Sequence, residues 1–336
     1  MPRTKVGIAV VGGGYWGTKL TREYLSLSKL RGDFEVYLVE RSQERRESIQ
    51  KEIGDSNLRL SQDYEEVLRN DKIDGVHIAT PNTTHYELAL GALEKGKHVL
   101  LEKPMTLSSR SAFELTRMAK ENGLVLQVGH IFRFNNAVEK ARQLIRNNEL
   151  GKTLYANLSW ASSLHPPEDH DVVFDLAPHP LDILNCLLDK WPSAVYARGK
   201  SYIRKTDLKE EVAFICFEFP DDILGHVYVS WLHRGAKERN VTIVGETATL
   251  QIDALNQKLT LIRDEAAREI PVVCNNTIQS MQNHFIDGTK HLGPSSNSAI
   301  IGAMSVHVLE FVHKSMNLGQ RIEIIGEEEG LGRNTP

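Results

Sequence analysis

Residues 5–17, KVGIAVVGGGYWG, decide the fold of this chain. A short continuous apolar run, typical of a strand buried on both faces of a parallel sheet, passes directly into a glycine-rich turn. Gly12, Gly14 and Gly17 fit the pattern G-x-G-x-x-G, and the helical sequence TKLTREYL follows. In this pattern the glycines permit a tight turn, close approach of a pyrophosphate, and close packing of helix on strand. Because a helix N-terminus offers free N–H groups to phosphates, the stretch predicts a dinucleotide-binding unit.

An acidic residue, Glu40, ends the second strand-like run, FEVYLVE, at about the expected distance of twenty-odd residues. Its carboxylate would accept hydrogen bonds from the adenosine ribose and oppose a 2′-phosphate by roughly a few kcal/mol, which favours NAD over NADP. Arg41 follows immediately, and since arginine forks suit phosphate, NADP is not excluded. Arg45 and Arg46 are expected on the solvated face of the second helix.

Residues 98–104, HVLLEKP, carry charged side chains to the end of another buried strand. The apolar run ends in Glu102 and Lys103, followed by Pro104, which cannot donate to a sheet. In open α/β sheets the carboxyl ends of the strands face the ligand crevice. A lysine there can hydrogen-bond a substrate hydroxyl or carbonyl, and its pKa can shift toward working pH. A surface turn with a solvated Glu–Lys pair is the alternative for these two residues alone.

The alternation of strands and helices continues to residue 130, and six strand-type runs separated by helices predict a doubly wound parallel sheet over residues 1–130. Its later helices are expected over residues 63–70, 84–96 and 107–123, and its later strands over 73–80, 98–103 and 124–130. The run ATPNTTH reaches the same rim, although His85 there is also typical of a helix-start residue that caps or is solvated. The residues expected to contact the cofactor are Gly12, Gly14, Tyr15, Trp16, Gly17, Glu40, Arg41, Thr80, Asn82, His85 and Glu102.

From residue 131 the pattern becomes one of alternating strands joined by short turns, which predicts an α+β domain over residues 131–326 with an open, mostly antiparallel sheet. A helix rich in polar residues is expected over 136–148, two more near 277–292 and 297–317, and a mobile polar tail over 327–336. An exposed apolar sheet face usually marks an interface, so we expect a homodimer or homotetramer through this sheet. The expected strands are KTLYANLSWA, SAVYARGKSY, EVAFICFEFP, ILGHVYVSWLH, RNVTIVGE, ATLQIDA, KLTLIRD, EIPVVC and RIEII.

Composition excludes several classes of protein. The 336 residues indicate two domains, and a net charge of −4 with a pI near 6.4 argues against a general nucleic-acid or membrane-surface binder. The N-terminus lacks a signal-peptide core, and no run of about 18 apolar residues occurs, so we expect a cytoplasmic protein. Cys186, Cys216 and Cys274 have no metal-binding spacing, and we interpret them as small buried hydrophobes. No metal site is predicted.

The second half of the site is expected in the sequence VVFDLAPHPLDIL. Asp175, His179 and Asp182 are spaced to share one helical face, but Pro180 confines the helix start to about Ala177. Asp175 then lies just ahead of the helix and His179 in its first turn. The helix dipole lowers the pKa of the imidazole while Asp175 raises it, which predicts a histidine that exchanges a proton near neutral pH. A structural capping network is the alternative.

Together the glycine turn, the ATPNTTH rim, the EKP tripeptide and the D-x-x-x-H-x-x-D motif resemble the glucose–fructose oxidoreductase / inositol dehydrogenase / MocA family over nearly the whole chain. The GYWG turn, FRFNNAV and FDLAPHPLD are similar to members of the UDP-N-acetylglucosamine 3-dehydrogenase type. The resemblance implies that Lys103 is the catalytic lysine and that Asp175 and His179 are its aspartate–histidine pair. Two departures are Ala177, a glycine in the family, and Pro180, often an aspartate in the nucleotide-sugar group.

The activity expected is reversible hydride transfer between a sugar carbon and nicotinamide C4. Either His179 or Lys103 takes the hydroxyl proton while the other orients the oxygen. Phe132, Arg133 and Asn135 join the Lys103, Asp175 and His179 set as candidate substrate contacts, with interdomain packing as the alternative. Three functions remain open: a nucleotide-sugar dehydrogenase, a dehydrogenase of free polyols or monosaccharides, and a non-catalytic dinucleotide-binding regulator.

Overall fold

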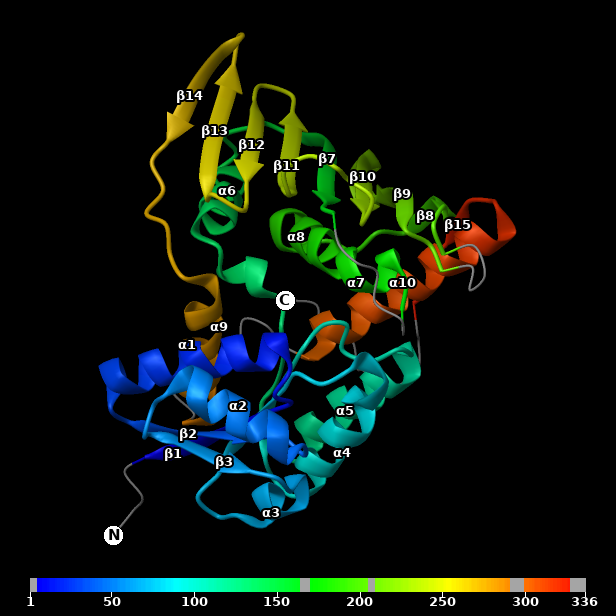
Figure 1. The fold of residues 1–336 in the computed structure, drawn as a ribbon. Coiled ribbons are helices and arrows are strands. Elements are labelled where there is room, and N and C mark those ends of the chain that lie inside the picture. The colour runs from blue at the N-terminus through cyan, green and yellow to red at the C-terminus, as the bar shows by residue number, and fades with distance from the viewer. Residues whose placement is uncertain (1–4, 164–169, 205–208, 291–298, 327–336) are drawn as a thin grey trace.

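A computed structural model describes residues 5–163, 170–204, 209–290 and 299–326, which form two sheets with helices packed between and around them (Figure 1). The expected tail over 327–336 lies outside these described residues. The break between the two predicted domains, after residue 130, falls between strand β6 and the short helix η2.

The first sheet has six parallel strands in the order β3-β2-β1-β4-β5-β6, which confirms the doubly wound fold. Six strand-type runs are expected, but only five of them have ranges, and these match five of the strands. The sixth, the edge strand β3, reads LRLS, lacks a continuous apolar run and is not located from the sequence. The strands are β1 (Val6–Val11), β2 (Phe34–Val39), β3 (Leu58–Ser61), β4 (Gly75–Ile78), β5 (His98–Leu101) and β6 (Leu126–Val128). The helices are α1 (Tyr15–Arg31), α2 (Gln43–Ile53), α3 (Tyr64–Arg69), η1 (Asn82–Thr84), α4 (His85–Glu94) and α5 (Ser109–Glu121).

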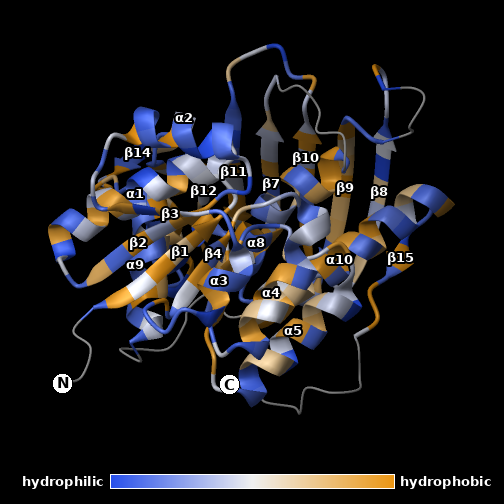
Figure 2. Cartoon of the chain, turned by 60° about the horizontal axis from the view of Figure 1, so that its bottom comes forward, coloured by the Kyte–Doolittle hydropathy of each residue, from blue (hydrophilic) through white to orange (hydrophobic). Residues whose placement is uncertain are grey.

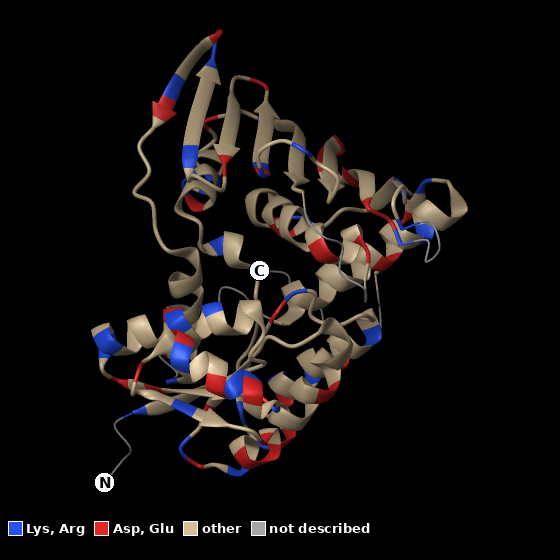
Figure 3. Cartoon of the chain, in the orientation of Figure 1, with Lys and Arg blue, Asp and Glu red and all other residues tan. Residues whose placement is uncertain are grey.

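Local sequence signals explain where these helices begin and end. Asp63 caps α3 and Ser108 caps α5 through side-chain oxygens that accept backbone N–H groups. Gly32 ends α1 in the left-handed conformation, with φ of 70°, which a side chain would disfavour. The charged residues of this domain lie mainly on the outer helices, as the dense red and blue of α2 shows (Figure 3). The strands beneath them are largely apolar (Figure 2).

The second sheet has nine strands in the order β14-β13-β12-β11-β7-β10-β9-β8-β15. All neighbours run antiparallel except β7 and β10, because the chain leaves β7 through two helices and returns to the sheet by way of β8 and β9. The strand expected at EIPVVC is displaced, since β14 spans Ala266–Ile270. The other strands are β7 (Thr153–Ala161), β8 (Ala194–Lys200), β9 (Val212–Phe219), β10 (Ile223–Ser230), β11 (Glu238–Gly245), β12 (Thr249–Asp253), β13 (Lys258–Arg263) and β15 (Ile322–Glu323).

Helices cover one face of this second sheet and connect it to the first domain (Figure 1). Helix α9 returns to the first domain, where Met281, Phe285 and Ile286 join the core formed by β1, β2 and α1. Helix α10 packs against both α5 and β8, so it belongs to both halves of the molecule. The helices are η2 (Ile131–Phe134), α6 (Asn136–Arg146), α7 (Val172–Leu176), α8 (Pro178–Leu188), η3 (Pro220–Asp222), α9 (Thr277–Thr289) and α10 (Ala299–Leu318).

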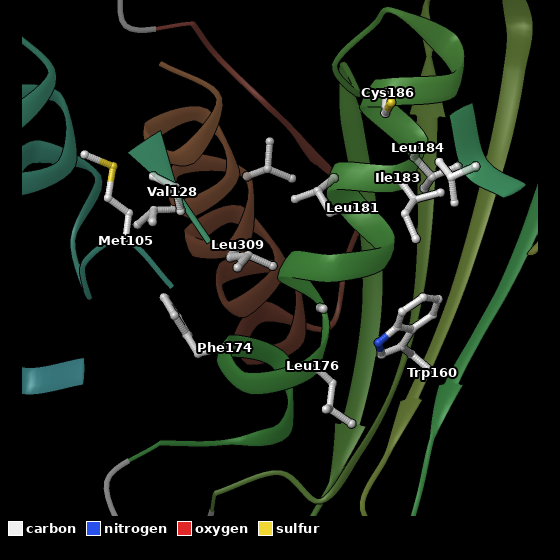
Figure 4. Packing of buried hydrophobic residues seen from close by; sticks show 14 of the residues in the cluster. Met105, Val128, Trp160, Phe174, Leu176, Leu181, Ile183, Leu184, Cys186 and Leu309 are labelled. Carbon is white, nitrogen blue, oxygen red and sulfur yellow. The ribbon is translucent and has the colours of Figure 1, made fainter. Parts of the chain in front are cut away.

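A single apolar cluster runs through the junction of the two domains (Figure 4). Met105 and Val128 come from the first domain, Leu309 from α10 and Leu181 from α8. A Cβ atom on Gly302 of α10 would lie 2.4 Å from a methyl carbon of Val128, so the absence of a side chain there lets the helix approach strand β6 closely. The two domains therefore share packed side chains over a broad area.

Two expectations from composition have different outcomes. Among the described residues, no helix is long and apolar enough to cross a membrane, while the cytoplasmic location remains a prediction. All three cysteines are free, but only Cys186 is buried; Cys216 and Cys274 are exposed, so interpreting all three as buried hydrophobes is wrong. Cys216 points to the uncovered face of the second sheet because β9 alternates between buried and exposed positions.

Candidate active site

A cavity of about 360 Å³ lies where the carboxyl ends of the first sheet face the second domain. Strands β4, β5 and β6 end at its lower wall, and α7, α8 and β11 supply the opposite wall. Its size falls within the usual range of small-molecule pockets. The lining residues are Trp16, Ala79, Thr80, Asn82, Glu102, Lys103, Gly129, Ile131, Phe132, Asp175, Leu176, His179, Lys237 and Arg239.

The glycine turn beside this cavity has the shape that a dinucleotide needs. Gly12 has φ of 105°, and a Cβ atom on Gly17 would lie only 1.8 Å from the Gly12 carbonyl oxygen. A Cβ atom on Gly14 would have no atom within 4 Å, so this position faces open space above the N-terminus of α1. No side chain caps that end of the helix. Its N–H groups are thus available to a pyrophosphate, and the turn fits the cofactor.

Glu40 lies next to this turn, as the sequence predicts. Its two carboxylate oxygens accept hydrogen bonds from the backbone N–H groups of Gly13, at 3.0 Å, and Ser42, at 2.9 Å. Arg41 is exposed. Arg45 and Arg46 do not simply extend into solvent as expected: they donate to carbonyl oxygens, Arg45 to that of Gly13 and Arg46 to those of Glu40 and Arg41. The arginine side chains therefore brace the loops on which the cofactor would rest.

The remaining predicted cofactor contacts separate into two groups. Trp16, Thr80 and Asn82 line the cavity, whereas Tyr15 is 83% exposed and lines a separate surface pocket. His85 does not line the cavity: it is buried, with ring nitrogens 2.9 Å from the Pro104 carbonyl oxygen and 3.1 Å from that of Thr80. Burial also lowers the pKa of His85. We therefore correct its predicted role as a cofactor contact: the side chain is neutral and supports the backbone beneath the cavity.

Glu102 forms part of the cavity floor and is anchored by buried partners. His77 Nε2 lies 3.1 Å from Glu102 Oε1, and the other nitrogen of that ring lies 3.2 Å from the hydroxyl of Tyr24. Burial raises the pKa of the Glu102 carboxyl, but the hydrogen bonds from His77 and Trp16 and the charge of Lys103 outweigh it, so the pKa is lowered. Glu102 is therefore a fixed negative charge.

Lys103 and Asp175 meet across the domain boundary. The Lys103 ammonium donates to the Asp175 carboxylate at 2.9 Å and to the Asp175 carbonyl oxygen at 2.7 Å. The indole N–H of Trp231 donates to the second carboxylate oxygen at 2.9 Å. Burial raises the pKa of Asp175, but Lys103 and the hydrogen bonds from His170, Lys103 and Trp231 hold it well below its usual range. The two residues therefore form an ion pair on the cavity wall.

His179 lies in the first turn of α8, as predicted, and lines the same cavity. Asp175 lies just ahead of that helix, as predicted, within a separate short helix, α7. Burial, followed by the charges of Lys103, Arg239 and His130, lowers the pKa of His179 well below its usual value, and Asp175 opposes this only in part. The expected titration near neutral pH is therefore wrong, because the sequence shows neither the burial of the ring nor the neighbouring cations. The imidazole is neutral at pH 7.

Of the three candidate substrate contacts after β6, one reaches the cavity. Phe132 lines it and packs edge-on against His179, with ring centroids 5.2 Å apart. Arg133 instead donates to the buried Asp182 carboxylate at 2.6 Å. Asn135 caps α6 by accepting from two backbone N–H groups and is 1% exposed. Arg133 and Asn135 therefore stabilise the fold instead of contacting the substrate, as in the alternative of interdomain packing.

The sequence did not predict Trp231, Lys237 and Arg239 as residues of the site. Trp231 orients Asp175, and Lys237 and Arg239 line the cavity from the start of β11. A signal for Arg239 exists in the sequence: with Val241 and Ile243 it occupies every second position of β11, so it falls on the buried face of that strand. A cation on an apolar face is unusual unless something pairs with it. The same alternation through β10 turns Trp231 inward.

An open glycine turn beside a cavity that holds a fixed ammonium group and a neutral imidazole meets the needs of hydride exchange with a dinucleotide. The fold and the cavity thus define a dinucleotide-dependent oxidoreductase. Residues 6–130 match the oxidoreductase family with an NAD-binding Rossmann fold, and residues 138–251 match the C-terminal domain of the GFO/IDH/MocA family. The chain belongs to this family, which confirms the resemblance found in the sequence.

Individual relatives are moderately similar. A UDP-N-acetylglucosamine 3-dehydrogenase of Acidithiobacillus ferrooxidans is 30% identical over 251 residues, covering 74% of each chain. A scyllo-inositol 2-dehydrogenase (NAD(+)) of Bacillus subtilis is 28% identical over 229 residues, 65% of this chain and 66% of the relative. A solved structure of the Acidithiobacillus ferrooxidans enzyme superposes with a TM-score of 0.80 at 24% identity, covering 94% of this chain and 98% of that one.

Proposed function

We propose that this protein oxidises a secondary alcohol of a sugar, reversibly, with NAD as hydride acceptor, and that the sugar is linked to a nucleotide, as in UDP-N-acetylglucosamine oxidised at carbon 3. The observation that carries the proposal is the convergence of Lys103, Asp175 and His179 on one cavity at the carboxyl ends of the first sheet. The named activity of the 30% identical relative supports the nucleotide-linked substrate.

The residues that would hold the cofactor are those of the open turn. Gly14 faces open space at the N-terminus of α1, and the lone pairs that remain on the Glu40 carboxylate suit ribose hydroxyls. When bound, NAD supplies an acceptor for hydride. Glu102, held by His77 and Trp16, keeps a negative charge on the cavity floor. Such a charge favours the positively charged oxidised nicotinamide over its neutral reduced form.

Lys103 orients the reacting oxygen in this proposal. An ammonium group has three N–H donors, and two of them are used by the side chain and the carbonyl oxygen of Asp175. The third is left for the substrate oxygen. The positive charge also favours the alkoxide character that develops as the hydroxyl proton leaves. Asp175 and Trp231 set the position of the ammonium and touch no reacting atom.

His179 accepts the hydroxyl proton. Its low pKa keeps the imidazole unprotonated, which a general base requires. Nδ1 is buried without a hydrogen-bond partner among the described residues, whereas Nε2 remains accessible on the cavity side. Nε2 is therefore the nitrogen that accepts the proton. The sequence leaves open whether His179 or Lys103 takes the proton. The ion pair between Lys103 and Asp175 supports His179, because it favours the charged ammonium form of the lysine.

A dehydrogenase of free polyols is the second candidate, supported by the 28% identical inositol dehydrogenase.

One assay distinguishes the candidates. Wild-type protein is incubated with NAD and, in turn, UDP-N-acetylglucosamine, scyllo-inositol and glucose, while the near-ultraviolet absorbance of the reduced nicotinamide reports NADH. We expect turnover with the nucleotide sugar and a loss of about 10²-fold or more in Lys103→Ala and His179→Ala. Lys200→Ala, on an exposed strand end, serves as the matched control.

Each outcome of that experiment decides between the candidates. Turnover of scyllo-inositol or glucose in preference to UDP-N-acetylglucosamine would transfer the proposal to the free-polyol class. Binding of NADH without turnover of any sugar, or full activity in both alanine variants, would support the non-catalytic regulator. The presence of Lys103 and His179 in the lining of the same cavity argues for catalysis over that regulator.

We also propose that the uncovered face of the second sheet joins two copies of the chain. Four large apolar side chains on neighbouring strands β7, β8, β9 and β10 are between 43% and 58% exposed: Tyr155, Tyr196, Phe214 and Leu224. A hollow of about 450 Å³ lies among these strands. Apolar patches of this kind usually bind another surface. Light scattering should show a dimer or tetramer that Phe214→Lys dissociates and the exposed control Val273→Lys does not; a monomeric wild type would contradict the proposal.

A further inference from the structure

Arg239 is a buried cation whose charge is not matched by a carboxylate of the described residues. It is 5% exposed, and its Cζ lies 5.1 Å from the centroid of the Trp160 ring. Nη1 donates to the carbonyl oxygens of Ala161 and Glu238. The other two guanidinium nitrogens have no partner among the described residues, yet they are not sealed from solvent. Since Arg239 lines the cavity, these donors reach its interior.

The charges of the described residues around the cavity do not balance. Among these residues, three cations line it (Lys103, Lys237 and Arg239) against the two carboxylates of Glu102 and Asp175. Both carboxylates are already engaged, Asp175 by Lys103 and Trp231 and Glu102 by His77. Within the part of the chain that the structure describes, neither Lys237 nor Arg239 forms an ion pair with an acid, and each lowers the affinity of the site for a further cation. A buried charge such as that of Arg239 is normally paired, which indicates that its missing partner is a ligand.

The position of this charge points to the substrate instead of the cofactor phosphates. Arg239 and His179 both pack on the indole of Trp160, whose centroid lies 6.2 Å from that of the His179 ring. Figure 4 shows Trp160 on the side of the second sheet that faces α7 and α8. The pyrophosphate cradle lies instead at Gly14, on the first domain. A group bound by Arg239 thus lies close to the proton acceptor.

We infer that Arg239 and Lys237 form an anion subsite, so that the sugar oxidised here carries a negatively charged oxygen group, a carboxylate or a phosphate, close to the reacting hydroxyl. The inference rests on the proposed function and narrows its substrate class. The planar guanidinium offers two parallel N–H donors to two oxygens, and the Lys237 ammonium adds a second charge from the cavity mouth. Neutral polyols leave both cations unpaired and bind more weakly.

The test compares Arg239→Gln, Arg239→Lys and Lys237→Gln with Arg234→Gln. Arg234 is an exposed arginine of the same segment and does not line the cavity, so it is the matched control. Isothermal titration of each NADH-loaded protein with UDP-N-acetylglucosamine, D-glucuronate and scyllo-inositol measures binding without requiring turnover. Separate titration with NADH measures cofactor affinity, and the melting temperature of each variant reports folding.

We expect Arg239→Gln and Lys237→Gln to weaken binding of the charged sugars by about 10- to 100-fold, the usual value of a hydrogen bond to a charged group. Arg239→Lys should lose less, and Arg234→Gln nothing. NADH affinity should stay within about threefold, which is under 1 kcal/mol. Preference for UDP-N-acetylglucosamine identifies a phosphate as the anion, and preference for D-glucuronate identifies a carboxylate.

Three results would overturn the inference: equal binding of scyllo-inositol and the charged sugars by the wild type, equal losses for neutral and charged sugars in the variants, or a loss of NADH affinity as large as the loss for the sugars. The last would mean that the cations serve the cofactor. Failure of the proposed oxidation is separate, because it would show as binding of a charged sugar without NADH formation. Lys237→Gln keeps the test valid if Arg239 variants melt early, since Lys237 is exposed.

Discussion

Replacing Asp175 by asparagine tests the arrangement on which the catalytic proposal depends. The side chains are isosteric, but the amide carries no charge and places an NH₂ group where the carboxylate has an oxygen. At present one carboxylate oxygen accepts from Lys103 at 2.9 Å and the other from Trp231 at 2.9 Å. The single amide oxygen of the Asp175→Asn variant can accept only one of these bonds, so either the Lys103 ammonium or the Trp231 indole is left facing another donor.

The size of the effect follows from distance and burial. Two unit charges 2.9 Å apart attract by about 6 kcal/mol at an effective dielectric constant of about 20, before desolvation is subtracted. The Lys103 and Asp175 side chains are 17% and 19% exposed. Their ion pair therefore lies between an exposed pair, worth about 0–1 kcal/mol, and a fully buried one, whose disruption costs about 3–5 kcal/mol. We expect the free energy of unfolding to fall by about 2–4 kcal/mol.

Two measurements follow from that value. An unfolding entropy of about 2.1 cal/mol/K per residue over 336 residues converts the loss into a decrease of about 3–6 °C in melting temperature, measured by circular dichroism. Because Lys103 also loses its fixed position, kcat for NADH formation should fall by about 10²-fold or more. Asp189→Asn is the control: it changes the same group in a surface ion pair with Arg146, in which the arginine and aspartate side chains are 53% and 64% exposed. The reasoning is refuted if Asp175→Asn behaves like Asp189→Asn in both assays.

Three further predictions address other parts of the site. Since the lowered pKa of His179 keeps its imidazole unprotonated as the pH falls to about 6.5, the acid limb of kcat/KM should lie below about pH 6.5; a limb at or above that value would exclude His179 as the base. Gly14→Ala should keep the melting temperature but weaken NADH binding at least about 10-fold, whereas Gly17→Ala, with its Cβ atom 1.8 Å from a carbonyl oxygen, should also lower the melting temperature. Arg133→Ala should lower the free energy of unfolding by about 3–5 kcal/mol in denaturant titrations by leaving a buried carboxylate unpaired, with the KM for sugar unchanged; a raised KM at unchanged stability would restore its substrate role.

Sequence patterns are reliable here wherever local physics decides the outcome. The apolar runs and the glycine turn depend on neighbours within a few positions, and the structure has them where predicted. Glu102 and Lys103 follow β5, and because the carboxyl ends of parallel strands meet at one edge of a sheet, the sequence alone places both residues at the cavity.

The errors arise where a partner lies far along the chain. Arg133 meets Asp182, 49 positions away, and this contact removes it from the substrate site. The pKa of His179 depends on Lys103 and Arg239, which come from the end of β5 and from β11 and are brought together only by the fold. The position of Lys103 is predictable because the residue comes directly after a strand. The protonation state of His179 is not, because its pKa depends on every group that surrounds the ring in the folded cavity.

The Lys103–Asp175 ion pair also joins the two halves of the molecule, because the lysine follows a strand of the first sheet and the aspartate lies in α7 of the second domain. The same contact thus works as a latch across the cleft. A hinge motion that widened the cleft to exchange nucleotide would separate the Lys103 ammonium from the Asp175 carboxylate, and with it the arrangement proposed for catalysis. Under the proposed mechanism, an open form would lack the arrangement needed for oxidation while nicotinamide enters or leaves the cleft.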